Sequence, residues 1–324
     1  MKYKLSMKQI NVLVTGVGAI IGYGIIKSLR SQQEHAVRIV GMDIYDDAYG
    51  QFLCDKFYVA ERADSPKYLD YINGVIDKES IDLIMPGIEQ DMYRLHELGD
   101  KVNTKVVLNN DLLIHLSKDK LETFRFFKEK GINVIPTLFE EPYEECVAQL
   151  GIPFLLKPRS SYASKGIHQI SSEEEFKFYN KCPKDNICQR IIGTDASEYT
   201  IAVFGKGDGT YADFIILKRK LAQTGATDKS MTIGFDKALM DYVDKICEIT
   251  KPFGPTNIQL RKDGDEVFLL EINPRVSSAC SIRTYMGYNE PLKCIELYLF
   301  GRHLEPEEKK EIHAVRFIDD FFYA

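Results

Sequence analysis

The sequence predicts an α/β protein in which an open, parallel, doubly wound sheet comes first and a β-hairpin lies near the end. Three observations predict this fold. In the N-terminal third, short apolar runs alternate with helical patterns, and strands that alternate with helices pair in parallel. A glycine turn, Gly16-Val17-Gly18, joins the first apolar run to its helix. Residues 254–275 hold two extended segments around a tight turn, which indicates a hairpin.

The N-terminal elements follow from their apolar patterns. Residues 10–15, INVLVT, form an apolar run typical of a strand buried on both faces. Glu89-Gln90-Asp91 follows the third expected strand, at the edge where open α/β sheets place ligands. These residues are candidate substrate contacts, although the first turn of any helix also favours acidic residues. Strands are expected at 10–15, 37–42, 81–85 and 105–108, and helices at 19–30, 66–79 and 89–100.

The glycine turn allows two interpretations. A dinucleotide-binding turn has the pattern G-x-G-x-x-G and an acidic residue about 20 positions later. Here Ile21 occupies the third position of that pattern, Gly22 comes one residue late, and Asp43 ends the second strand. The match is partial. An NAD(P)-dependent oxidoreductase is therefore one interpretation, and a strand-to-helix turn that only glycine can make is the other.

The hairpin carries a cluster of oxygen ligands. Glu271 and Asn273 share one face of the second strand because they are two residues apart, and Gln259 lies beside them on the first strand. A carboxylate with two amide oxygens suits Mg²⁺, which prefers oxygen ligands. Arg275 follows at once and suits charge-assisted contact to a phosphate or a carboxylate. The alternative is a surface hairpin with a polar outer face.

The pattern Asn257-x-Gln259 … Glu271-Ile272-Asn273-Pro274-Arg275 resembles the metal-binding hairpin of the ATP-grasp superfamily. In spacing it is most similar to a single ATP-grasp unit of the carbamoyl-phosphate synthase large subunit. The resemblance implies a Rossmann-like N-terminal parallel-sheet lobe followed by a two-lobed α+β ATP-grasp fold. It implies three domains: a Rossmann-like pre-ATP-grasp domain at 1–115, a small lobe with a phosphate flap at 116–186, and a large lobe with the metal hairpin at 187–324. It favours the non-dinucleotide interpretation, because this N-terminal lobe usually binds part of the acceptor substrate.

The middle of the chain supplies cations for the nucleotide phosphates. Asp119-Lys120 begins a helix expected at 120–131, and the resemblance implies that Lys120 contributes a cation there. Lys157 ends a short buried strand and can place a point charge at the α- or β-phosphate. A loop of small residues follows at 160–166, and its backbone N–H groups can wrap phosphate oxygens, although an ordinary hairpin loop would look the same. The nucleotide contacts expected from this flap are Ser164, Lys165 and Gly166.

A hinge of the ATP-grasp type is expected after the flap. Glu198 would accept hydrogen bonds from the ribose hydroxyls. Gln189 stands where the superfamily has a glutamate, and Ser278 stands where carbamoyl-phosphate synthase has an arginine. Arg283, on a helix expected shortly after Ser278, could take the place of that arginine and reach the same cleft. Adenine would be held by the backbone groups of Arg190, Ile191 and Ile192.

Composition limits the partners and the compartment. The formal net charge of −6 argues against a general nucleic-acid binder. Seven dispersed cysteines without a Cys-x-x-Cys pair fit reduced thiols in the cytoplasm. The uncharged run at 10–26 contains four glycines and lacks a cleavage site, so neither a signal peptide nor membrane association is expected. Met7 is a candidate start, and a homodimer is left open.

The resemblance implies an ADP-forming ligase that joins a small-molecule carboxylate to a small-molecule amine through an acyl phosphate. ATP and Mg²⁺ are the expected cofactors, with two ions and with Mn²⁺ able to substitute. Arg275 and Lys157 are the expected catalytic residues. Gln259, Glu271 and Asn273 are the expected metal ligands, and Glu271 also contacts the nucleotide. The alternatives are a non-catalytic ATP-binding module and the oxidoreductase.

Overall fold

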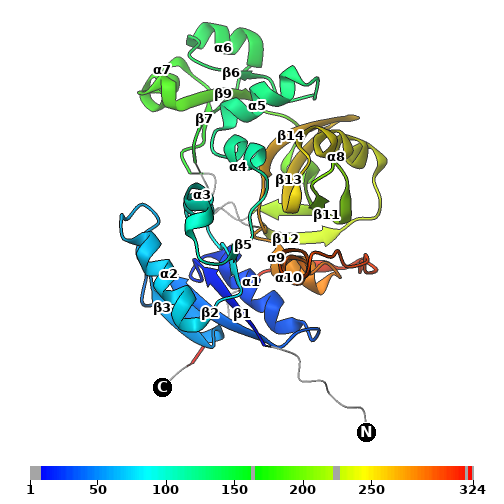
Figure 1. Ribbon diagram of the computed structural model, residues 1–324. Helices are drawn as coiled ribbons and strands as arrows, with labels where there is room; N and C mark the ends of the chain where they lie inside the picture. Colours follow the sequence, from blue (N-terminus) through cyan, green and yellow to red (C-terminus); the bar gives the residue numbers. More distant parts are fainter. Residues whose placement is uncertain (1–8, 162–164, 222–226, 318–319, 323–324) are drawn as a thin grey trace.

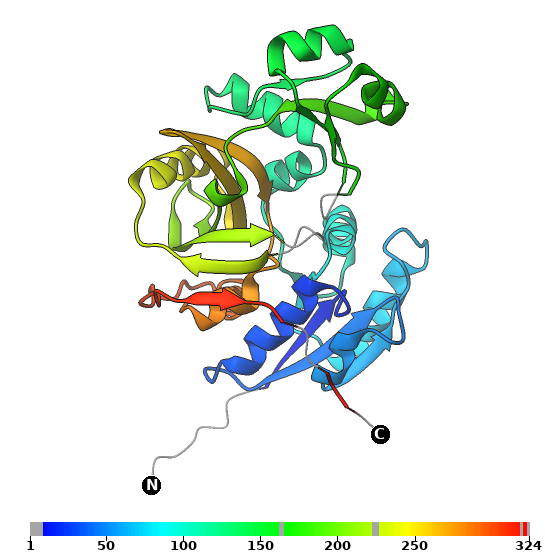
Figure 2. The same cartoon turned by 180° about the vertical axis from the view of Figure 1, so that it is seen from behind.

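The computed structural model describes residues 9–161, 165–221, 227–317 and 320–322. These residues form three lobes, each built on one sheet (Figure 1). The N-terminal lobe lies at one end and a small lobe at the other, with the largest sheet beside the junction between them (Figure 1). Figure 2 shows the same order from behind. All seven cysteines are free thiols.

The N-terminal lobe is a five-stranded parallel sheet with the order β3-β2-β1-β4-β5, so the predicted doubly wound sheet is confirmed. Central β1 has Val12, Leu13 and Val14 fully buried, because helices cover both faces of the sheet. The strands are β1 (Ile10–Thr15), β2 (Val37–Asp43), β3 (Lys56–Val59), β4 (Leu83–Met85) and β5 (Lys105–Val106). The helices are α1 (Ile20–Ser31), α2 (Tyr68–Glu79) and α3 (Glu89–Leu98), with short 3₁₀ turns at η1 (Tyr49–Leu53) and η2 (Gly99–Lys101).

The small lobe is a four-stranded antiparallel sheet with the order β6-β9-β7-β8. Its helix α5 begins where Asp119 accepts hydrogen bonds from the backbone N–H groups of Leu121 and Glu122, a favourable N-cap. The strands are β6 (Thr137–Leu138), β7 (Phe154–Pro158), β8 (His168–Ile170) and β9 (Asn186–Arg190). The helices are α4 (Asp111–Ser117), α5 (Lys120–Glu129), α6 (Tyr143–Leu150) and α7 (Glu173–Tyr179), with η3 (Pro183–Asp185) before β9.

The large lobe is a six-stranded antiparallel sheet with the order β14-β13-β10-β11-β12-β15. Helix α8 buries Leu239, Val243 and Ile246, the stripe at helical spacing that the sequence shows. The strands are β10 (Glu198–Lys206), β11 (Tyr211–Leu221), β12 (Thr227–Thr232), β13 (Phe253–Asp263), β14 (Glu266–Asn273) and β15 (His313–Val315). The helices are α8 (Lys237–Thr250), α9 (Cys280–Tyr285) and α10 (Glu290–Phe300), and η4 (Asp195–Ser197) precedes β10.

Most expected elements are present with shifted ends. The third expected strand starts at Leu83 and not at residue 81, and the fourth stops at Val106 and not at residue 108. The last strand of the described residues is His313–Val315. None of the helices in the described ranges is long and apolar enough to cross a membrane.

Candidate active site

A pocket of about 470 Å³ opens where the three lobes meet. Its walls come from the start of α1 and α3, from the small-lobe sheet, and from one face of the large sheet. Apolar walls are given by side chains such as Ile20, Ile88, Ile192 and Leu270. The charged and amide side chains that line it are Glu89, Gln90, Lys120, Lys157, Gln189, Arg190, Glu198, Arg219, Asn257, Gln259, Arg261, Glu271 and Arg275.

The hairpin of β13 and β14 sets the order of polar groups across this pocket. Antiparallel pairing places Gln259 opposite Glu271 and Asn257 opposite Asn273. Residues two apart on β13 share a face, so Arg261, Gln259 and Asn257 follow one another along the pocket. The Arg261 end faces the small-lobe hinge, and the Asn257 end is nearer the N-terminal lobe, as the contacts below show. The predicted hairpin and its face are therefore confirmed.

The three predicted metal ligands are neighbours, but arginines hold the two amides. Oε1 of Gln259 accepts from Nη2 of Arg219 at 2.6 Å, and Oδ1 of Asn273 accepts from Nη2 of Arg275 at 3.2 Å. Asn273 is buried and donates through Nδ2 to Oε2 of Glu271 at 3.3 Å. Each amide oxygen keeps a second lone pair, and all three groups offer oxygen. The set therefore fits a hard cation such as Mg²⁺, with Glu271 as its charged member.

Other metal chemistry finds less support. Within the described ranges, no group of three or more His, Cys, Asp or Glu side chains is placed to hold a metal ion. A site for a softer metal would be built from Cys and His ligands.

Glu198, the predicted ribose ligand, is clamped between two arginines. Its Oε1 accepts from Nε of Arg219 at 2.9 Å, and its Oε2 accepts from Nη2 of Arg261 at 2.6 Å. Arg261 also donates to the backbone carbonyl of Ile192 at 3.3 Å, so it ties the hinge to the large sheet. The Glu198 and Arg219 side chains are only 6% and 5% exposed. In this buried charge cluster, Oε2 of Glu198 accepts a hydrogen bond from Arg261 and keeps one further lone pair for a ligand.

Sequence reasoning missed both arginines. Arg261 is opposite Glu198 in the β10–β13 register. Arg219 comes from β11, the other neighbour of β10. The available signal was period-2 spacing, since Arg261 is two residues from Gln259 on a strand already assigned to the site. Arg219 had no comparable signal, because its position depends on the pairing of β10 with β11.

Lys157 points into the pocket and has a neutral partner. Its Nζ donates to Oε1 of Gln189 at 2.6 Å. Burial, with Lys120 and Arg261 nearby, lowers the pKa of the Lys157 ammonium to about 8, although Glu271 and Glu198 oppose the shift. A glutamate at position 189 would stabilise the charged lysine more strongly than this amide does. Lys157 is thus a cation whose charge depends on pH close to neutrality.

The other predicted nucleotide contacts are spread around the same opening. Lys120 lines the pocket and donates to the backbone oxygen of Ser161 at 3.0 Å, at the start of the flap. Arg190 and Ile192 also line the pocket, whereas Ile191 is not among its lining residues. Lys165 and Gly166 are exposed and outside the pocket lining. Ser164 lies outside the described residues.

The end of the pocket nearest the N-terminal lobe holds an ion pair between lobes. Nη2 of Arg275 donates to Oε1 of Glu89 at 2.6 Å, which joins the hairpin to the start of α3. Glu89 and Gln90 line the pocket as predicted for substrate contacts, but Asp91 is buried and bonded to Tyr68. The predicted catalytic arginine is therefore held between the β13–β14 hairpin and the N-terminal lobe.

The expectation that Arg283 reaches the cleft is wrong. Arg283 lies on α9 and is fully buried beside the pocket, where it donates to Thr200 and Asn257. It also faces Glu290 at 3.6 Å, and both side chains are fully buried. Arg283 stays with Glu290 because moving it to the pocket would leave the Glu290 carboxylate unpaired in the interior, which costs several kcal/mol. Ser278 does line the pocket, in the place where the superfamily arginine was expected.

The carboxylate of Asp43, at the end of β2, occupies a backbone donor of the glycine turn. Oδ2 of Asp43 accepts from the backbone N–H of Gly18 at 2.7 Å, a donor that a pyrophosphate would need. Glycine is required at Gly22, since a Cβ there would lie 2.3 Å from the carbonyl oxygen of Gly16. A second pocket of about 170 Å³ adjoins the turn, and its charged lining residues in the described chain are Asp43, Glu61 and Asp91. Such an acidic pocket repels a dinucleotide pyrophosphate, so the strand-to-helix interpretation is favoured.

Comparisons with known proteins now bear on the whole fold. Residues 194–321 match the family "ATP-grasp in the biosynthetic pathway with Ter operon", and residues 12–108 match "PylC-like, N-terminal domain". The N5-carboxyaminoimidazole synthetase from Staphylococcus aureus, complexed with ADP, superposes with a TM-score of 0.72 over 95% of this chain and 81% of that chain, at 19% identity. Residues 194–321 thus belong to an ATP-grasp family, and the chain as a whole has the fold of this ATP-grasp neighbour. An L-amino acid ligase from Bacillus licheniformis shares the fold with a TM-score of 0.67 over 91% of this chain and 75% of that one, at 13% identity.

Curated relatives of this chain are distant in sequence. A formate-dependent phosphoribosylglycinamide formyltransferase from Methanocaldococcus jannaschii is 24% identical over 75% of this chain and 65% of the relative. A carbamoyl-phosphate synthase from Methanobrevibacter smithii is 23% identical over 75% of this chain and 69% of the relative. The chain spans 42% to 65% of the length of the first relatives it matches. The resemblance to ATP-grasp enzymes, including carbamoyl-phosphate synthase, is thus confirmed.

Proposed function

We propose that this chain is an ATP- and Mg²⁺-dependent ligase that joins a small-molecule carboxylate to an amine and releases ADP and phosphate. The observation that carries the proposal is the order of groups along one pocket. Hinge-bound Arg261 and Glu198 come first, Glu271 follows, and Arg275 paired with Glu89 comes last. That order fits a nucleotide base at the hinge, phosphates at the hairpin and an acceptor at the N-terminal lobe. The relatives include a formate-dependent phosphoribosylglycinamide formyltransferase and a carbamoyl-phosphate synthase, and both names fit the activation of a small carboxylate, which supports the proposal.

The proposed chemistry needs no protein nucleophile. An oxygen of the substrate carboxylate attacks the γ-phosphorus of ATP, and the bond from that phosphorus to the bridging oxygen breaks with its electron pair left on ADP. The amine nitrogen then attacks the carbonyl carbon of the acyl phosphate, inorganic phosphate leaves, and the nitrogen loses one proton to solvent. Arg275 and Lys157 meet the negative charge that develops on the transferred group.

The remaining residues are assigned by position. Lys120, Lys157 and the flap residues Ser164, Lys165 and Gly166 would hold phosphates. Arg190, Ile191 and Ile192 would hold adenine through the backbone, and Glu198 would hold ribose. Gln259, Glu271 and Asn273 would hold two Mg²⁺ ions, which Mn²⁺ could replace. When bound, magnesium would neutralise charge on the triphosphate.

The proposed domains are 1–115, 116–186 and 187–324. The three separate sheets support this division. Strand β9 begins at Asn186 and pairs within the small-lobe sheet, so it crosses the last boundary.

The sequence left a homodimer open, and light scattering of the purified chain measures the oligomeric state directly. Cytoplasmic location stays a prediction, and fractionation of cells tests it.

The test is ADP release from Mg-ATP with pools of amino acids and small carboxylates, compared with Glu271→Gln. Release that requires one pool and disappears in the variant is the expected result. Mg-ATP binding without pool-dependent ADP would favour the alternative, a non-catalytic ATP-binding module. Failure of Mg-ATP to bind would contradict the proposal as a whole, and a parallel NAD(P) titration would then test the oxidoreductase.

A further inference from the structure

Asn257 presents a fixed hydrogen-bond donor to the pocket. Its Oδ1 accepts from Oγ1 of Thr200 at 2.6 Å and from Nη2 of Arg283 at 2.7 Å. A guanidinium has donors and no acceptor, so the amide atom that faces Arg283 must be the oxygen. The NH₂ group therefore points the other way. Asn257 lines the pocket, and within the described chain no hydrogen bond is made by its Nδ2.

Buried charged side chains fix the orientation of the Asn257 amide. Arg283 on α9 is fully buried and also donates to Thr200 at 3.0 Å. Its charge is balanced by Glu290 of α10, 3.6 Å away and also fully buried. Rotation of the Asn257 amide would place its NH₂ against a buried cation, and withdrawal of Arg283 would leave Glu290 unpaired in the interior. The donor consequently stays aimed at the pocket.

The donor lies at the transfer end of the site. Asn257 is opposite Asn273, one step beyond the pair of Gln259 and Glu271. Asn273 in turn accepts from Arg275, which binds Glu89 of the acceptor lobe. The NH₂ group of Asn257 thus faces the interval between the carboxylate that would hold a cation and the ion pair at the acceptor end.

We propose that Nδ2 of Asn257 donates a hydrogen bond to an oxygen of the phosphoryl group that moves from ATP to the acceptor carboxylate, and that Arg283 and Glu290 are positioning residues for this donor. The inference rests on the proposed function. In the step concerned, the bond from the γ-phosphorus to its bridging oxygen breaks and a bond to the acceptor oxygen forms, so negative charge spreads over the oxygens that Asn257 faces. A donor aimed at such charge is strengthened in the transition state.

The test uses calorimetry to compare the affinity of the protein for two ligands, the magnesium complex of ADP and the magnesium complex of the β,γ-imido analogue of ATP. The Asn257→Asp variant keeps an oxygen towards Arg283 and turns a second oxygen, in place of the donor, to the pocket. Affinity for the imido analogue relative to ADP is expected to fall at least tenfold, while ADP affinity changes less than twofold. The rate constant kcat for ADP release is expected to fall about 10²-fold.

The positioning role has its own variant. Arg283→Met combined with Glu290→Gln removes the buried pair together, so neither charge is left alone. This double variant should lose the preference for the imido analogue, and adding Asn257→Asp should cost little more, because all three changes act through one donor. If the losses of affinity for the imido analogue in the double variant and in Asn257→Asp were independent and additive, the positioning role of Arg283 and Glu290 would be overturned.

Two results would overturn the donor role. One is an Asn257→Asp protein that keeps its preference for the imido analogue within twofold. The other is an equal loss of affinity for ADP and for the analogue, which would indicate general distortion of the pocket. If Asn257→Asp does not fold, Asn257→Ala removes the donor without adding charge and carries the same test. Wild-type protein that binds neither nucleotide would contradict the proposed function and not this inference alone.

Discussion

Lys157 makes phosphate binding sensitive to pH close to neutrality. Burial, with Lys120 and Arg261 nearby, lowers the pKa of its ammonium to about 8, and its direct partner is the neutral Gln189. The free protein therefore carries the charge below pH 8 and loses it above. Since the charged form binds phosphate, Mg-ATP affinity should decline as the pH rises from 7 to 9.5. A charged hydrogen bond contributes about 1.5–3 kcal/mol, so the decline should be roughly tenfold or more, as calorimetry at each pH would measure.

Two variants control this experiment. Lys157→Arg keeps its charge throughout the range, so its affinity for Mg-ATP should not vary with pH in the same way. Gln189→Glu gives Lys157 an anionic partner, raises its pKa and should move the decline to higher pH. An affinity of the wild-type protein that stays constant to pH 9.5 would show that the Lys157 charge does not contribute to binding.

Arg219 holds the charge cluster of the site together. Its guanidinium bonds Glu198 and Gln259 in a setting where its side chain is 5% exposed. Arg219→Met would leave Glu198 buried with one arginine fewer, and breaking a buried pair costs about 3–5 kcal/mol. Urea unfolding should show a loss of that size. Lys237→Met, which breaks an exposed pair with Asp241, should show no measurable loss. Equal effects in the two variants would mean that the buried cluster is no stronger than a surface pair.

At the residue scale, sequence reasoning finds groups that lie close in sequence or on one strand face. Glu271, Asn273 and Gln259 were found because a hairpin fixes their neighbourhood from spacing alone. Arg219 was not found, because it meets Glu198 only through the pairing of β10 with β11. The burial of Arg283 was not foreseen either, because its partner Glu290 comes from the next helix and the pair excludes it from the cleft.

The hinge between the small and large lobes depends on one glycine. Gly193 has a φ of +55°, and a Cβ there would lie 2.4 Å from the carbonyl oxygen of Lys262. Gly193→Ala should cost about 1–2 kcal/mol for the left-handed backbone and about 1–3 kcal/mol more for the collision. Displacement of Lys262 would also move Arg261, so Mg-ATP affinity should fall as well.

A second glycine supplies the matched comparison for the hinge. Gly301, the C-cap of α10, has a φ of +68°, and an added Cβ there meets no described atom within 4 Å. Gly301→Ala should therefore show the backbone cost alone and leave Mg-ATP affinity unchanged. Thermal unfolding of both variants measures the difference. If Gly301→Ala is as destabilising as Gly193→Ala, then the close approach to Lys262 is not what makes the hinge glycine necessary.

At the element scale, strands with a clear apolar pattern were predicted from the sequence, and short or edge strands without one were missed. The hairpin has Leu260 and Ile272 buried at the spacing that two strands require, so both strands were found. Strand β3, at the edge of its sheet, has no fully buried side chain and gave no apolar run. Strand β6 is only two residues long, Thr137–Leu138, and exists because β9 pairs with it. Such strands are set by tertiary contacts that spacing does not reveal.

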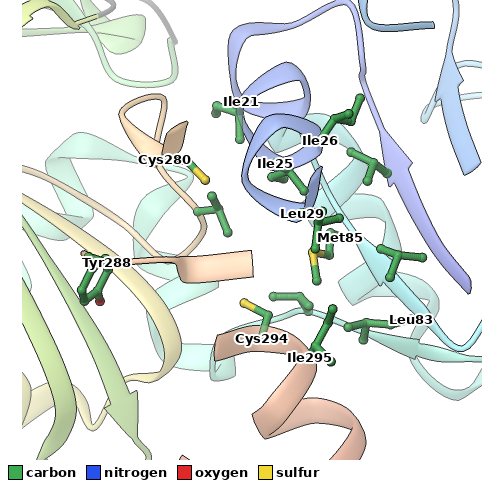
Figure 3. Packing of buried hydrophobic residues seen from close by; sticks show 14 of the residues in the cluster. Ile21, Ile25, Ile26, Leu29, Leu83, Met85, Cys280, Tyr288, Cys294 and Ile295 are labelled. Atoms are coloured by element: carbon green, nitrogen blue, oxygen red, sulfur yellow. The ribbon is translucent and has the colours of Figure 1, made fainter. Parts of the chain in front are cut away.

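At the scale of the whole molecule, the N-terminal and large lobes share one hydrophobic core. Figure 3 shows side chains of α1, such as Ile21 and Ile25, facing Cys280 of α9 and Ile295 of α10. The same cluster includes Leu83 of the parallel sheet (Figure 3). The small-lobe sheet instead packs in a separate cluster around Leu150, whereas α4 and α5 contribute Leu113 and Phe127 to the core of the large lobe. The N-terminal and large-lobe sheets thus share one cluster, and the small lobe packs on the large lobe through its helices α4 and α5.

This division predicts how the molecule responds to a cavity. Ile295 is fully buried in the shared cluster, so Ile295→Ala should cost about 2–5 kcal/mol. Because the two lobes bury the same side chains, amides of β1 and of β13 should both exchange faster with deuterium, as mass spectrometry would show. Leu150→Ala makes a cavity of the same kind in the small lobe and should accelerate exchange there alone. If Ile295→Ala affected β13 and left β1 protected, the N-terminal lobe would be an independent folding unit, and the shared core would be an interface between two units.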